Sequence, residues 1–159
     1  MTGDVPRLVN HVGLTVSDLE ASVAFYRDVV GFELVRRGPR QRTGEWFDTL
    51  TDNEGVVMES AILASEGFAL QLLQYFAGGE AQAWTGHNRV GNVHLAINVD
   101  DLDERHARIV ASGQWSPSPI VELPIPGQRS FYVRDPDGVP VEFGEGPYRA
   151  ETTGVPKRD

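Results

Sequence analysis

The segment that decides the fold reads His11-Val12-Gly13-Leu14-Thr15-Val16-Ser17-Asp18-Leu19, and it returns as His94-Leu95-Ala96-Ile97-Asn98-Val99-Asp100-Asp101-Leu102. A second pair of segments follows, Glu66-Gly67-Phe68-Ala69-Leu70-Gln71-Leu72 and Asp137-Gly138-Val139-Pro140-Val141-Glu142-Phe143. Each half of the chain therefore has a histidine near its start and a glutamine or glutamate near its end. Internal repetition of this kind indicates a structural unit that occurs twice.

Both halves predict the same order of elements. Alternating apolar residues predict a strand over residues 8–16 and another over 92–99, each followed by a helix. We expect Ser17 to cap the first helix, which ends at Gly31, and Asp100 or Asp101 to cap the second, which ends at Gly113. The remaining expected strands are 32–36, 58–63 and 68–75 in the first half and 120–123, 130–134 and 139–144 in the second. The pattern is βαβββ written twice, an α+β fold.

The repeat also predicts the domain organisation. The two modules cover residues 7–76 and 90–146, joined by a linker over 77–89, and together form one domain over 1–146. Residues 38–55 are polar and predict a long loop. Residues 147–159 contain no periodic apolar pattern, so we expect a poorly ordered tail.

Composition excludes several classes of partner. The chain has 159 residues, no cysteine and a formal charge of −9. Without cysteine, a metal site must use nitrogen and oxygen donors. The negative charge argues against nucleic acid or an anionic membrane as partner and leaves a small-molecule substrate. The chain has no apolar run of about 20 residues and no secretory signal, so we expect a cytoplasmic protein.

Strand alternation sorts the repeated histidines onto one kind of face. Val12, Leu14 and Val16 share the aliphatic face of the first strand, so His11 lies on the other. His94 lies likewise on a face with small or polar neighbours, which suits a cavity better than a packed core. If each sheet curls, His11, Gln71, His94 and Glu142 can converge.

The remaining histidines have no counterpart in the other half. His87 lies in the linker, where we expect it to face solvent. His106 lies on the apolar stripe of the second helix, which predicts a half-buried structural role. A lone strand histidine is usually structural, but two equivalent histidines, each with an equivalent oxygen donor, favour a metal site.

Several motifs resemble the vicinal oxygen chelate superfamily, which includes glyoxalase I, methylmalonyl-CoA epimerase, extradiol dioxygenases and drug-resistance proteins. The resemblance covers most of residues 8–146. Its elements are His11 with Val16-Ser17-Asp18-Leu19, Phe25-Tyr26-Arg27-Asp28 before Gly31-Phe32, His94 with Val99-Asp100-Asp101-Leu102, and Asp135-Pro136-Asp137-Gly138 before Val141-Glu142-Phe143. It implies two βαβββ modules whose curved mixed sheets surround a shared cup with a divalent metal. It also implies a homodimer, with modules paired within one chain or across the dimer.

The set His11, Gln71, His94 and Glu142 is most similar to the metal ligands of methylmalonyl-CoA epimerase. Glyoxalase I usually has glutamate where Gln71 stands, and extradiol dioxygenases use two histidines and one glutamate. The epimerase commonly has two adjacent histidines where this chain has Val93-His94. The resemblance also makes Glu59 a candidate catalytic base. Strand register decides whether Glu59 or Ser60 faces the site, because a one-residue slip reverses the face.

The resemblance implies an epimerase, isomerase or lyase whose metal ion stabilises an enolate during proton transfer. The ion is Zn, Co, Ni, Mn or Fe, and the candidate bases are Glu59 and Glu142. An anionic or CoA-linked substrate is one hypothesis for the role of the arginines at positions 36, 37, 40 and 42; a solvated loop is the other. Two other functions stay open: a metal-independent protein that sequesters a small hydrophobic ligand, and an Fe(II) dioxygenase of the extradiol type.

Overall fold

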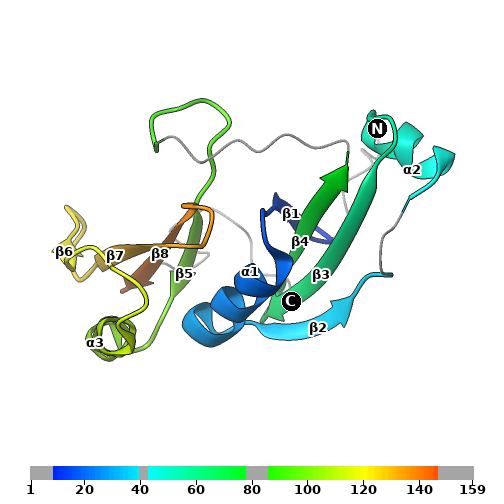
Figure 1. The fold of residues 1–159 in the computed structure, drawn as a ribbon. Coiled ribbons are helices and arrows are strands. Elements are labelled where there is room, and N and C mark those ends of the chain that lie inside the picture. Colours follow the sequence, from blue (N-terminus) through cyan, green and yellow to red (C-terminus); the bar gives the residue numbers. More distant parts are fainter. Residues whose placement is uncertain (1–8, 40–42, 78–85, 147–159) are drawn as a thin grey trace, which may run out of the picture. The chain divides into compact units, whose positions relative to one another are not determined.

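The computed structural model describes residues 9–39, 43–77 and 86–146 (Figure 1). The chain divides into two compact units, Met1–Gln82 and Ala83–Asp159, and the division falls within the expected linker. Each unit contains one four-stranded sheet. Among the described helices, none is long and apolar enough to cross a lipid bilayer.

The two units repeat one topology. The elements of the first are β1 (Val12–Thr15), α1 (Leu19–Phe25), the π-helix η1 (Tyr26–Val30), β2 (Glu33–Arg37), α2 (Glu45–Thr51), β3 (Val57–Ser65) and β4 (Phe68–Ala77). Those of the second are β5 (Leu95–Asn98), α3 (Leu102–Ser112), β6 (Val121–Glu122), β7 (Arg129–Arg134) and β8 (Pro140–Glu145). The strand orders are β1-β4-β3-β2 and β5-β8-β7-β6, with the first strand of each unit parallel to its last. The predicted α+β fold with a duplicated βαβββ order is confirmed.

In each unit the aliphatic face of the sheet packs against the helix that follows the first strand. In the first unit, Leu63, Leu70 and Leu72 are fully buried on the side covered by α1. In the second, Phe131 and Phe143 are fully buried on the side covered by α3. Burying each such side chain contributes roughly 1.5–3 kcal/mol. The opposite side of each sheet is therefore the one available for a site.

Aspartates begin the helices that follow these strands. The Asp18 carboxylate accepts a hydrogen bond from the Ala21 amide, and the Asp101 carboxylate accepts one from the Glu104 amide. The prediction of Ser17 as the first cap was therefore wrong by one residue. Gly31 ends the first helical segment at φ 94°, a left-handed conformation that favours glycine.

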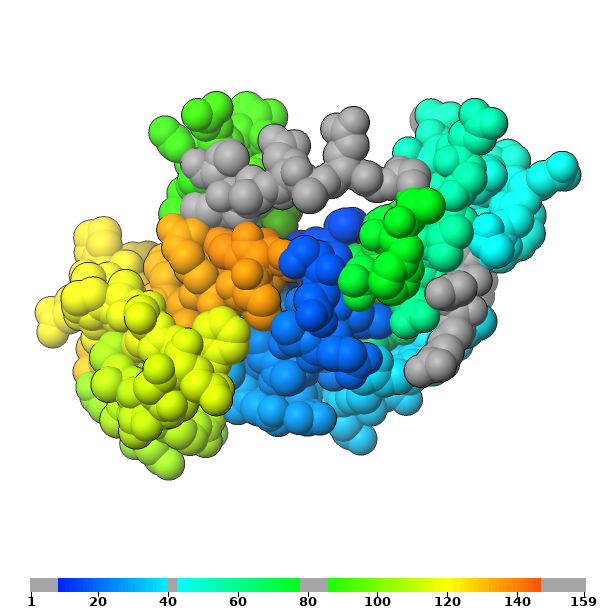
Figure 2. All heavy atoms as spheres, in the orientation of Figure 1, coloured from blue at the N-terminus to red at the C-terminus, as the bar shows by residue number. Residues whose placement is uncertain are grey.

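The prediction of a loop over 38–55 was wrong for its second part, which contains α2. Only Phe47 of this seven-residue helix is buried, so the sequence has no periodic apolar pattern for α2. Phe47 packs with Val56 and Met58 against Leu73 and Tyr75. Figure 1 shows α2 at the end of the sheet where β4 finishes and β3 begins, and Figure 2 shows its spheres at the surface of the first unit.

Candidate metal centre

We call the side of each sheet that faces away from α1 or α3 the open face. In the second unit, Glu142 of β8 lies on this face between Ala96 of β5 and Tyr132 of β7. His94 stands two residues before Ala96, and its Nε2 atom is 3.8 Å from Glu142 Oε2. The His94 side chain is 47% exposed and that of Glu142 is 13% exposed. The two predicted ligands of the second unit therefore lie close together, with His94 half-exposed to solvent and Glu142 largely buried.

Tyr132 contacts both of these residues. Its phenol donates a hydrogen bond of 2.5 Å to Glu142 Oε2, and its ring lies edge-on to His94 at 6.0 Å between centroids. The sequence interpretation did not single out Tyr132. A signal was present, since Tyr132 alternates with the fully buried core residue Phe131 along β7.

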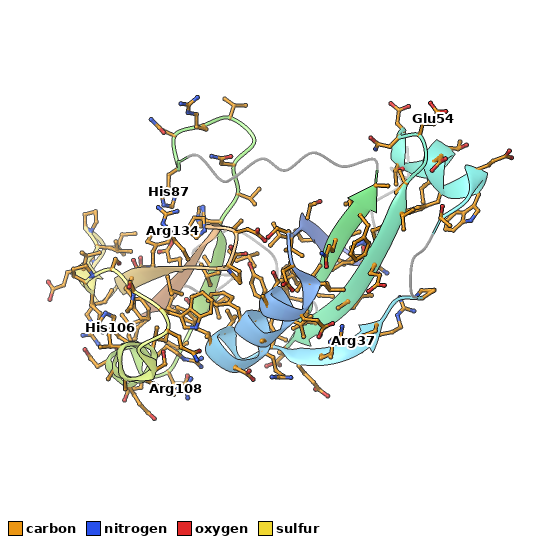
Figure 3. All side chains as sticks on the ribbon, viewed as in Figure 1. Arg37, Glu54, His87, His106, Arg108 and Arg134 are labelled. Carbon is orange, nitrogen blue, oxygen red and sulfur yellow. The ribbon has the colours of Figure 1, made fainter. Side chains whose placement is uncertain are left out.

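His87 belongs to the same cluster. Its side chain is exposed, as expected, but its ring lies 5.1 Å from Tyr132 and 6.1 Å from His94 between centroids. Figure 3 shows the ring pointing from the segment before β5 towards the strands of the second unit. We therefore assign His87 to the edge of the open face rather than to free solvent.

A shallow pocket of about 110 Å³ opens beside the Glu142 carboxylate. It is lined by Ala96, Ile97, Asn98, Glu142 and Gly144. The small side chain of Ala96 on the neighbouring strand β5 and the lack of one at Gly144 on β8 itself leave room for a ligand atom near the carboxylate. Ala96 and Asn98, which share the face of His94, line this pocket, whereas His94 itself does not.

The first unit carries the matching pair. Gln71 of β4 lies on the open face between Gly13 of β1 and Ile62 of β3. His11 stands two residues before Gly13, as His94 stands before Ala96, and it is exposed. Its Nδ1 atom lies 2.7 Å from the Asn10 side-chain oxygen. If Nδ1 carries the proton and donates it to that oxygen, Nε2 keeps the lone pair that coordination through Nε2 requires.

The strand register decides between Glu59 and Ser60, a choice that the sequence left open. Residue 71 pairs with Ile62, so Ser60, two residues earlier, shares the open face with Gln71. Glu59 pairs with Gln74 on the other face, where the Gln74 side chain bonds to the start of α1. Because directly opposed residues point to one side of a sheet, Glu59 does not face Gln71.

The distance between two of the candidate donor atoms would allow them to share a metal ion. Two donors that each lie about 2.1 Å from one ion are at most about 4.2 Å apart. The 3.8 Å between His94 Nε2 and Glu142 Oε2 is within this limit. The bond from Tyr132 occupies part of the carboxylate only, because an ionised carboxylate has about four lone-pair sites. Among the residues that the structure describes, no group of three or more His, Asp or Glu side chains lies at metal-binding spacing.

His106 has the structural role that the sequence predicted. It is half-buried on α3, its Nε2 lies 2.9 Å from the Ser118 carbonyl oxygen, and its ring lies edge-on to Phe131. It lies on the helix side of the sheet, away from Glu142.

Comparison with known proteins identifies the family. The profile of the Glyoxalase/Bleomycin resistance protein/Dioxygenase superfamily matches residues 8–143. The chain therefore belongs to this superfamily, as the sequence motifs predicted. A specific relation to methylmalonyl-CoA epimerase does not follow from this match.

The relatives include proteins with a named activity and proteins with a solved structure. A 2-epi-5-epi-valiolone epimerase from an Actinomyces species is 29% identical over 141 residues, covering 85% of this chain and 77% of the relative. The crystal structure of lactoylglutathione lyase from Agrobacterium tumefaciens matches with a TM-score of 0.59 and 29% identity, covering 89% of this chain and 95% of the other. A glyoxalase family protein from Bacillus cereus matches with a TM-score of 0.79 at 19% identity, covering 91% and 97%, and supports the fold alone.

Proposed function

We propose that His11, Gln71, His94 and Glu142 bind one divalent metal ion and that the protein is a metal-dependent epimerase, isomerase or lyase. One observation carries the proposal: each sheet presents a histidine and an amide or carboxylate oxygen at equivalent places on its open face. The two pairs together supply two imidazoles, one amide and one carboxylate, a donor set suited to Zn, Co, Ni, Mn or Fe.

The charge of this set favours an electrophilic ion. Glu142 is the one formally charged ligand of the four, so a bound divalent ion keeps about one positive charge. Four protein ligands on an ion that accepts about six leave room for two neighbouring substrate oxygens. When bound, the ion supplies Lewis-acid stabilisation of a developing enolate oxygen.

We propose that Glu142 takes part in the proton transfer α to the substrate carbonyl. With Glu59 on the other face, Glu142 is the remaining candidate base of the two that the sequence indicated. It acts as base only when it is not bound to the metal. The hydrogen bond from Tyr132 orients the carboxylate, and the small residues beside it leave space for the substrate carbon.

The relatives support an epimerase first and a lyase second. The Actinomyces relative is an epimerase and the Agrobacterium relative is a lactoylglutathione lyase. Removal and return of one carbon-bound proton is a step that an epimerisation needs, with no organic cofactor. We therefore take methylmalonyl-CoA and 2-epi-5-epi-valiolone as the first substrates to test.

Solvent exchange tests the proposal directly. Metal-loaded protein is incubated with each candidate substrate in D₂O, and deuterium at the α-carbon is followed by NMR. We expect incorporation with at least one substrate, its loss after chelation, and its return on adding Co²⁺ or Zn²⁺. The His106→Gln variant, altered outside the site, should keep the activity, and the His94→Ala variant should lose it.

Two results would contradict the proposal. If the purified protein binds no divalent ion, the proposed metal-dependent activity is excluded. If His94→Ala binds a small hydrophobic ligand as the wild type does and neither protein binds a metal, the chain is a sequestering protein instead.

A further inference from the structure

A β-bulge in β2 separates two adjacent arginines. Leu34 pairs with Leu63 of β3, but the next paired residue of β2 is Arg36, opposite Ile62. Val35 is the extra residue and is 60% exposed. A bulge of this kind re-aims the side chains that follow it.

The bulge sends Arg37 to the side of the sheet covered by α1. Arg37 pairs with Ala61, and its guanidinium binds the Glu20 carboxylate of α1 through two hydrogen bonds of 2.5 and 2.8 Å. Figure 3 labels Arg37 where β2 passes α1. Arg37 is thus occupied by an ion pair on the helix side.

The same shift sends Arg36 to the open face. Arg36, Ile62, Gln71 and Gly13 form one row across the four strands, since each is the direct partner of the next. Adjacent strands are about 4.8 Å apart, so the backbone of Arg36 lies roughly 10 Å from that of Gln71. Without the bulge, alternation would place Arg36 on the helix side and Arg37 beside the site.

The surroundings of Arg36 leave its charge available. Arg36 is exposed, and no ion pair to it occurs within residues 9–39, 43–77 and 86–146. Gly38, which directly follows β2, has no side chain, and a Cβ there would collide with Ser60 Oγ. The end of the face beyond Leu73 and Tyr75 is closed by Phe47 of α2. A cation thus stands at the rim of this face in a chain of net charge −9.

We propose that Arg36 binds an anionic group of the substrate, a carboxylate or a phosphate, and so selects substrates that carry a negative charge in addition to the oxygens that would bind the metal. This inference rests on the proposed metal site. It assigns to Arg36 alone a role that the sequence had left open for the arginines at 36, 37, 40 and 42, of which the last two lie outside the described residues.

The test compares Arg36→Gln with Arg37→Gln, a control that removes the same charge one residue away on the other face. The probes are straight-chain dicarboxylates from succinate to suberate, and phosphonocarboxylates of the same lengths, titrated by calorimetry into the Co²⁺-loaded full chain. One carboxylate of each probe binds the metal, and the other acid group extends towards Arg36. Butyrate, which has no second charge, serves as the probe control.

We expect Arg36→Gln to weaken the longer dianionic probes by 10-fold to 100-fold, about the value of a charge-assisted hydrogen bond, and to leave butyrate within twofold. Arg37→Gln should leave all of them within twofold. The larger loss among carboxylates or among phosphonates identifies the anionic group. Equal affinities in the two variants would overturn the role of Arg36 while the metal site stands, whereas a wild type that takes up no Co²⁺ would overturn the proposed function itself.

Discussion

The two units carry equivalent pairs of proposed metal ligands, but the residues around the two pairs differ. Gln71 lies between Gly13 and Ile62, while Glu142 lies between Ala96 and Tyr132. The scaffold is repeated, but Glu142 is negatively charged and has a tyrosine directly opposite it, whereas Gln71 is neutral and lies opposite Ile62. We infer that the first unit mainly holds the metal and that the second unit also moves the proton.

The supporting residues are repeated as well. Three residues after each oxygen ligand, a side chain caps the helix of its unit: Gln74 Oε1 accepts from the Leu19 amide at 2.9 Å, and Glu145 Oε2 from the Leu102 amide at 3.1 Å. Here too the first unit uses an amide and the second a carboxylate. Arg129 donates hydrogen bonds to the carboxylates of Asp103 and Glu145. These two bonds raise the pKa of the Arg129 guanidinium.

Exchanging the two oxygen ligands should have the largest effect. Glu142→Gln removes the negative ligand and the base, so we expect a loss of activity of about 10³-fold, within the range for general-base catalysis, together with weaker metal binding. Adding Gln71→Glu should restore metal binding but not activity, because Tyr132 stays beside position 142. The measurements are metal titration and α-deuterium exchange. An active exchanged variant would show that the two units are interchangeable.

Removing the phenol should have the next largest effect. Tyr132→Phe leaves the ring contacts but removes the hydrogen bond to Glu142, so we expect metal affinity to fall by 10-fold to 100-fold. Ile62→Val, at the equivalent place beside Gln71, should change it less than twofold. Titration with Co²⁺, followed by absorption, would measure the metal affinity of both variants. An unchanged affinity in Tyr132→Phe would mean that the phenol does not orient the carboxylate.

The helix caps should give the smallest effects, and on stability alone. Gln74→Ala removes bonds to the Leu19 amide and the Ser17 carbonyl, so we expect a loss of about 1–2 kcal/mol in the free energy of unfolding. Glu145→Ala should cost a similar amount. Urea unfolding measures both, with metal affinity as the control. A cap variant that loses metal but not stability would place that residue in the site instead.

The duplicated pattern was enough to predict the fold and to place a histidine and an amide or carboxylate oxygen on the same face of each sheet. Alternation sorts His11 and His94 from the aliphatic face because that face must be buried, and burial leaves a period in the sequence. Register leaves no such mark, so the position of Glu59 had to come from the structure. The bulge at Val35 reverses the faces of Arg36 and Arg37 by a single residue, and the short helix α2 has one buried residue, so neither has a periodic signal.

The stoichiometry of bound metal tests most directly the claim that both units serve one ion. Elemental analysis of the purified chain should give one divalent ion per polypeptide. His11→Ala and His94→Ala should each reduce it to near zero, although the two residues belong to different units. Two ions per chain, or one ion retained after either substitution, would contradict the account, because each half would then bind metal alone or not at all.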